Sequence, residues 1–143
     1  MKKSILIMAA TLLLTAVSCA TTMNSANNQV GTHPWELEYI TGPRITFEGL
    51  YPDKKPIITF DAAGKTVRGN SGCNGYSTTY TISGNKISFG EPGISTMMYC
   101  GDGEVVFRNT MKEINRYQID AEGKLNLMMN DVVMMRFKKS VTP

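Results

Sequence analysis

Three short, glycine-containing loops divide much of the chain into pairs of strand-like segments, and this repetition most strongly limits its fold. The loops are residues 61–64, 83–85 and 121–123. Glycine readily adopts the positive φ angle that tight antiparallel turns require, so each loop predicts a hairpin. The flanking segments are short and rich in apolar and β-branched residues, as strands are. The expected strands are residues 35–40, 57–60, 65–69, 76–82, 86–89, 116–120, 124–129 and 132–138.

One segment has helical rather than strand-like periodicity. Phe107, Met111 and Ile114 recur at i, i+4 and i+7 and form one apolar stripe. The helix is expected over residues 104–115, with Asp102 as its N-cap. Short strands joined by tight turns, together with this helix, predict a mainly β (α+β) fold. We expect a compact antiparallel β-barrel-like sheet with one packed α-helix.

The first 18 residues have the composition of an export signal. Lys2 and Lys3 form a basic start, residues 5–17 form an apolar run, and small residues precede Cys19. The run is shorter than the about 20 residues that span a membrane. The order resembles the lipobox of bacterial lipoproteins, which implies a lipoprotein signal peptide over residues 1–18 and a lipid-modified Cys19. A simple secretory signal, with Cys19 incidental, is the alternative.

The residues after the signal predict how the protein is held. Residues 19–33 are mostly small and polar, so a flexible tether is expected there, followed by one domain over residues 34–140. Ala20 stands where lipoproteins retained at the inner membrane usually have Asp. A lipid anchor in the outer membrane is therefore expected, with the domain in the periplasm or at the cell surface. The formal net charge of +3 includes both signal-peptide lysines and falls to +1 without them, which is too small a basic surplus to indicate nucleic acid as a partner. The domain is expected to be a monomer.

Two motifs lie on either side of the second hairpin. Residues 67–76 read VRGNSGCNGY, residues 95–100 read STMMYC, and Glu104 follows. With the pattern Y-x-I-x-G-N-x-I-x-F that begins at Tyr80, they resemble the META domain of heat-inducible, HslJ-like lipoproteins over residues 35–138. The resemblance implies a compact barrel-like domain packed with a helix, export, and a link to the stress response. It implies no established enzymatic chemistry.

The same resemblance singles out the candidate site. The glycine-rich loop would either contact a ligand or form a scaffold corner that positions Cys73 and the residues around it. Both interpretations stay open for this set: Gly69, Ser71, Gly72, Asn74, Tyr76, Thr96, Met97, Met98 and Glu104.

Cys73 and Cys100 remain as an even pair once Cys19 is lipidated. Export to an oxidising compartment predicts a disulfide between them, worth about 3 to 4 kcal/mol in the chain-entropy picture. Two free buried thiols or a two-thiolate metal site are the alternatives. A zinc site would need further ligands, and the only histidine, His33, lies in the expected tether.

Little in the chain indicates catalysis or a cofactor. The sequence has no G-x-S-x-G elbow, P-loop or H-E-x-x-H motif. Methionine doublets at residues 97–98, 128–129 and 134–135 could bind Cu(I), but we interpret them as core packing. No enzyme activity, metal or cofactor is therefore expected.

Two functions remain from this reasoning. In the first, the chain is an envelope lipoprotein, accessory or stress-related, whose domain contacts an envelope protein. In the second, the curled sheet binds a small apolar ligand, as small barrels can. The first predicts an exposed apolar patch, and the second a cavity lined by methionine and aromatic side chains.

Overall fold

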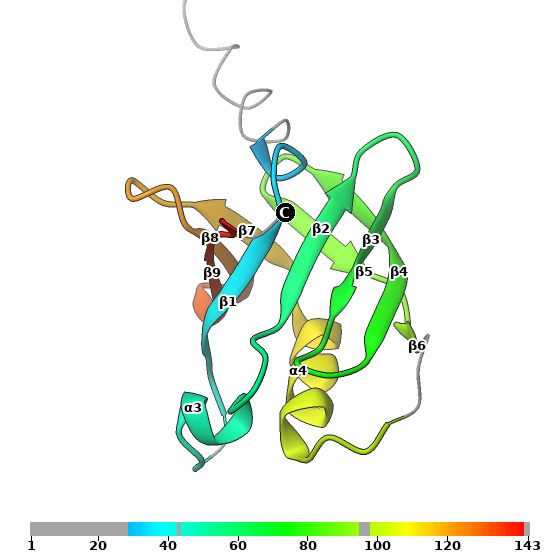
Figure 1. Cartoon of the computed structure of the whole chain (residues 1–143). Helices are drawn as coiled ribbons and strands as arrows, with labels where there is room; N and C mark the ends of the chain where they lie inside the picture. Colours follow the sequence, from blue (N-terminus) through cyan, green and yellow to red (C-terminus); the bar gives the residue numbers. More distant parts are fainter. Residues whose placement is uncertain (1–28, 43, 95–97, 142–143) are drawn as a thin grey trace, which may run out of the picture.

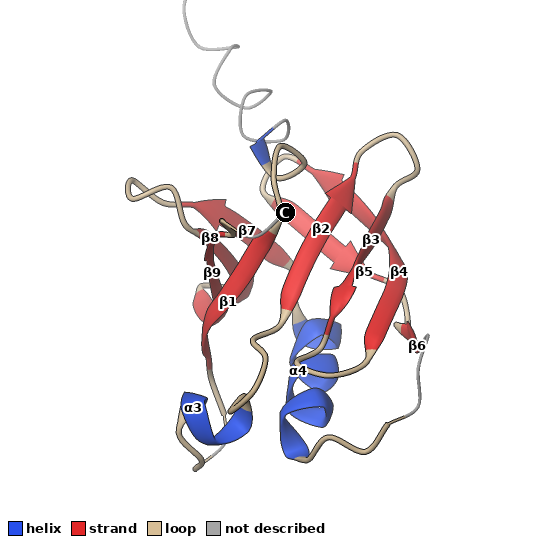
Figure 2. Ribbon diagram, in the orientation of Figure 1, coloured by secondary structure: helices blue, strands red, loops and turns tan. Residues whose placement is uncertain are grey.

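The computed structural model describes residues 29–42, 44–94 and 98–141, and Figures 1 and 2 show their arrangement. The strands are β1 (Trp35–Ile40), β2 (Ile57–Asp61), β3 (Thr66–Asn70), β4 (Gly75–Ser83), β5 (Lys86–Phe89), β6 (Gly93–Ile94), β7 (Arg116–Ile119), β8 (Leu125–Met129) and β9 (Val132–Lys139). The helices are α3 (Phe47–Leu50) and α4 (Asp102–Glu113).

The strands close into an antiparallel barrel. They pair in the order β3-β2-β1-β9-β8-β7-β5-β4, and β6 adds to β4. A further pairing between β3 and β4, from Thr66↔Thr79 to Asn70↔Gly75, joins the two ends of this order. Closure leaves the strands of the barrel without a long open edge. The predicted mainly β fold, a barrel-like antiparallel sheet with one packed helix, is confirmed.

The three predicted loops connect the strand pairs β2–β3, β4–β5 and β7–β8. In the first, the Asp61 carboxylate accepts hydrogen bonds from the backbone N–H groups of Ala63 (3.1 Å) and Gly64 (3.2 Å). In the other two, Gly84 and Gly123 have φ angles of 59° and 75°. These left-handed positions suit glycine, so local turn chemistry determines where each hairpin reverses.

Helix α4 lies at one end of the barrel, close to α3 (Figure 1). Its predicted apolar stripe is buried: Phe107, Met111 and Ile114 are at most 3% exposed. The predicted N-cap is wrong, because Gly101 caps the helix with a φ of 75° and the helix starts at Asp102. It also ends earlier than expected, at Glu113, because the extended backbone of Ile114 leads directly into β7.

Large side chains fill the barrel interior. Those that are fully buried include Trp35, Leu37, Ile58, Val67, Phe107, Met111, Leu125, Leu127, Met135 and Phe137. Of the doublet methionines that the structure describes, Met135 is fully buried and Met128, Met129 and Met134 are half-buried, whereas Met98 is 64% exposed. The packing interpretation therefore holds for Met135 and is wrong for Met98, because the segment before α4 runs over the surface. Tight packing of this kind supplies most of the hydrophobic stabilisation of a small domain.

The N-terminal boundary of the packed domain differs from the expected one. Val30 is 2% exposed, and the indole N–H of Trp35 donates to its carbonyl at 2.8 Å. The backbone N–H of Ser140 donates to the carbonyl of Pro34 at 2.9 Å, which places the two ends of the domain together. The expected tether over residues 19–33 is therefore too long at its C-terminal end. Burial of Val30 offsets the conformational entropy that is lost when residues with the composition of a linker become ordered. None of the helices that the structure describes is long and apolar enough to cross a bilayer.

Candidate functional site at the disulfide end of the barrel

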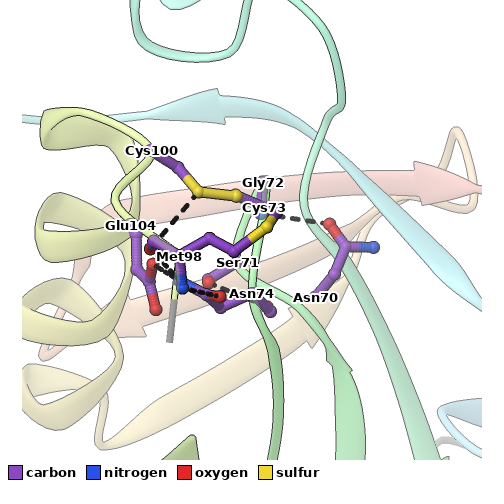
Figure 3. The surroundings of a disulfide bond; sticks show 8 residues. All are labelled: Asn70, Ser71, Gly72, Cys73, Asn74, Met98, Cys100 and Glu104. Atoms are coloured by element: carbon purple, nitrogen blue, oxygen red, sulfur yellow. Dashed lines mark hydrogen bonds between the residues drawn. A yellow bond between two sulfur atoms is a disulfide. The ribbon is translucent and has the colours of Figure 1, made fainter. Parts of the chain in front are cut away.

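The loop between β3 and β4 is joined to the segment before α4 (Figure 3). Cys73 and Cys100 form a disulfide across a separation of 27 residues, with their Cα atoms 6.0 Å apart. That Cα distance lies within the range a disulfide spans. Both cysteines are half-buried, so the bond lies near the surface. A cysteine held in a disulfide has no thiolate to act as a nucleophile or a metal ligand.

Asn74 forms the second connection between the same two segments. Its side chain is buried, and its amide nitrogen donates to the carbonyl of Met98 at 2.7 Å and also to the Glu104 carboxylate. Its amide oxygen accepts from the backbone N–H of Met98 at 3.0 Å. One side chain thus binds both the N–H and the carbonyl of Met98 in the neighbouring segment, and it also fixes a carboxylate on α4. Three residues of the predicted site are brought together here.

Ser71 and Gly72 shape the turn that presents Asn74. The backbone N–H and the hydroxyl of Ser71 both donate to the carbonyl of Asn74, at 2.9 and 3.1 Å. Gly72 has a φ of 103°, and a Cβ at this position would lie 2.7 Å from the ring of Tyr51. Only glycine satisfies both the backbone angle and the close approach. For these residues the scaffold-corner interpretation explains every contact.

Gly69 and Tyr76 face each other across the β3–β4 pair. A Cβ on Gly69 would lie 1.7 Å from the carbonyl oxygen of Ile57, so β2 can approach β3 only at a glycine. Tyr76 is buried against Phe107, with ring centroids 5.5 Å apart, and burial raises the pKa of its hydroxyl. Within the part of the chain that is described, this hydroxyl has no hydrogen-bond partner. Both residues act in packing, whereas Thr96 and Met97 lie outside the described residues.

Helix α3 also contributes to this end of the barrel, and the sequence patterns did not predict it. The Tyr51 hydroxyl donates to the carbonyl of Gly103 at 2.9 Å, and burial raises the pKa of this hydroxyl. A Cβ on Gly103 would lie 2.4 Å from the carbonyl oxygen of Leu50, so α3 and the first turn of α4 meet at a glycine. The only sequence signal was Gly103 itself, an unfavourable residue inside an expected helix start.

These segments enclose a surface hollow of about 670 Å³, which we call the disulfide hollow. Its lining includes Tyr51, the disulfide, Met98, Tyr99, Lys54 and Glu104. Met98 and Tyr99 are 64% and 94% exposed, so both large side chains present much of their surface to solvent. The volume falls in the range of protein ligand sites.

His33 lies away from the disulfide hollow, near the start of β1. Its Nδ1 atom lies 2.7 Å from the Thr32 hydroxyl, and its ring packs on Trp35 with centroids 4.3 Å apart. Burial, and secondarily the charge of Lys139, lower the pKa of this imidazole. Among the residues that the structure describes, no cluster of three or more His, Cys, Asp or Glu side chains could hold a metal ion. Cys19, the predicted lipidation site, lies outside the described residues.

The fold and the site together define a closed antiparallel barrel with a packed helix. A disulfide and a buried asparagine connect the β3–β4 loop to the segment before α4 at one end of this barrel. The family model of the META domain matches residues 26–142, and the chain therefore belongs to the META domain family. A search of curated proteins found no match. The chain is similar to the solved NMR structure of a protein from Burkholderia xenovorans, with 22% identity and a TM-score of 0.62. That match covers 89% of this chain and 94% of the other, and it supports the fold alone.

Proposed function

We propose that this META domain chain is a non-enzymatic envelope lipoprotein, accessory or stress-related in role, that binds a protein partner through the disulfide end of its barrel. The proposed anchor is the lipid on Cys19, held in the outer membrane. Acyl chains contribute about 0.8 kcal/mol per buried methylene, so two or more give stable anchoring. The order of basic, apolar and small residues before Cys19 supports this anchor.

The arrangement of the domain is consistent with a binding surface held away from the membrane anchor. The described chain begins beside the C-terminal end of β9, whereas α3 and the start of α4 lie at the other end of the barrel (Figure 1). A tether that enters near Val30 would leave the disulfide hollow directed away from the membrane. A partner could then reach the hollow without contacting the bilayer.

The observation that carries the proposal is where apolar side chains are exposed. Met98 and Tyr99 line the hollow. Two further exposed apolar residues lie on segments that contribute Leu50 and Glu104 to its lining: Ile45, 46% exposed, just before α3, and Val105, 56% exposed, on α4. Exposed apolar groups that gather around a concave surface are typical of interaction sites. The barrel interior, in contrast, is occupied by the side chains of its own core. The packing thus favours an outward-facing surface over an apolar ligand held inside the barrel.

A photo-crosslinking experiment tests this function. The full-length protein carries p-benzoylphenylalanine in place of Tyr99, and a control variant carries it in place of Val132, which is also exposed but does not line the hollow. Irradiation of whole cells should give an adduct of defined mass from position 99 and none from position 132. Absence of an adduct at 99, or equal adducts at both positions, would contradict the proposed function.

A further inference from the structure

Most half-buried carboxylates in the described part of the chain have a clear partner. Glu36, Glu38 and Asp61 each lie 2.8 to 3.6 Å from the nitrogen of a lysine or arginine. Asp120 accepts hydrogen bonds from the backbone of Glu122 and Lys124, at 3.0 and 2.9 Å. A carboxylate that loses part of its water is normally compensated in one of these ways.

Glu104 is the exception among these half-buried groups. One of its carboxylate oxygens accepts from the Asn74 side chain, and no described lysine, arginine or histidine nitrogen lies within 4.0 Å of either oxygen. Glu104 is one of the residues that line the disulfide hollow. A negative charge held in place by a buried amide is thus available to an occupant of the hollow.

The rest of the lining suits the stem of a cationic side chain. Met98 and Tyr99 offer apolar surface, and the faces of the Tyr99 ring are open to solvent because this residue is 94% exposed. Aromatic faces attract ammonium and guanidinium groups, and lysine and arginine pack their methylene stems along apolar surface. Asp53 adds a second acidic residue to the lining, against one cation, Lys54.

We propose that the disulfide hollow receives a lysine or arginine side chain from a partner protein, with the cationic group paired to Glu104 and its stem packed on Met98 and Tyr99. This inference rests on the proposed function and states the chemistry of the partner. Asn74 is the positioning residue, because it fixes the carboxylate. A role for Glu104 confined to stabilising the first turn of α4 through the helix dipole would predict no selectivity for a cation.

The test compares two peptide probes on the full-length protein extracted in detergent. Ac-Leu-Lys-Leu-NH2 carries the cation, and Ac-Leu-Nle-Leu-NH2 replaces lysine by uncharged norleucine. The methyl NMR signal of Met98 reports occupancy of the hollow. The lysine probe should bind about tenfold more tightly than the norleucine probe, as expected for a partly exposed ion pair with a cation–π contact.

Three variants make the test specific. Glu104→Gln keeps an acceptor for Asn74 but removes the charge, so the tenfold preference for lysine should disappear. Glu113→Gln removes an exposed carboxylate at the other end of the same helix and should leave the preference unchanged. Lys54→Ala removes the competing cation and should strengthen binding of the lysine probe. Equal binding of the two probes to the wild type, or a preference that survives in Glu104→Gln, would overturn the inference.

The two proposals fail in different ways. A crosslinked partner at position 99 whose capture is unchanged by Glu104→Gln would leave the proposed function standing and refute the cationic side chain. Selective binding of the lysine probe without any adduct at position 99 would support the cationic site and contradict a resident protein partner in the envelope.

Discussion

Replacement of Asn74 by Ala removes the amide that holds the segment before α4 against the β3–β4 loop. The change deletes two hydrogen bonds to the backbone of Met98 and one to the Glu104 carboxylate. A hydrogen bond contributes about 1 kcal/mol, and one to a charged group about 1.5 to 3 kcal/mol. Water can replace part of the loss, because Met98 is exposed and Glu104 is only half-buried. We therefore expect the free energy of unfolding to fall by about 2 to 4 kcal/mol, a large share of the about 5 to 15 kcal/mol of a typical domain.

Urea unfolding followed by tryptophan fluorescence measures this loss. Trp35 is the only tryptophan and is fully buried in β1, away from the changed site, so its signal reports cooperative unfolding of the whole barrel. With a slope of about 2 kcal/mol per molar, the urea midpoint should fall by roughly 1 to 2 M while the slope stays the same. The matched control is Asn109→Ala, at an exposed position on α4, which should change stability by less than about 0.5 kcal/mol.

The effect of Asn74→Ala on stability depends on whether the disulfide is intact. It holds Cys73 and Cys100 together without Asn74, so the measurement is made in the absence of reductant. The cost of Asn74→Ala should increase after reduction, because two connections between the same segments are not independent. A loss below about 1 kcal/mol under both conditions would refute the view that this amide stabilises the disulfide end of the barrel.

Three further predictions concern the cysteines and one glycine. Native protein should not react with a thiol reagent at Cys73 or Cys100 without reductant. Replacement of both cysteines by serine should lower the free energy of unfolding by about 3 to 4 kcal/mol. Labelling of both thiols in native protein, detected by mass, would contradict the bond. Gly69→Ala should cost more than about 2 kcal/mol in thermal unfolding, since its Cβ would collide with the backbone of β2, whereas Gly93→Ala should cost less; equal losses would be inconsistent with the close approach. Cys19→Ser should leave an uncleaved precursor or a soluble protein in cell fractionation, and soluble wild type and variant of identical mature mass would exclude lipidation.

Local patterns in the sequence predicted the class of fold. The turn glycines at positions 84 and 123 and the apolar stripe of Phe107, Met111 and Ile114 act through backbone angles and side-chain period, which depend on near neighbours alone. The family motifs also contained Asn74 and Glu104, so the sequence indicated which residues to examine. It left open whether they bind a ligand or hold the scaffold.

Contacts between distant segments required the tertiary structure. Val30 looked like part of a tether, and its burial depends on the first strand placing Trp35 beside it. The contact between Tyr51 and Gly103 joins residues 52 positions apart, and no local pattern encodes that separation. Closure of the barrel through β3 and β4 is likewise a product of long-range packing. So is the setting of the half-buried Glu104 carboxylate, which has no cationic nitrogen of the described residues within 4.0 Å. Turn and helix signals are carried by consecutive residues, whereas the surroundings of a buried or half-buried group are determined only when the whole chain has closed around it.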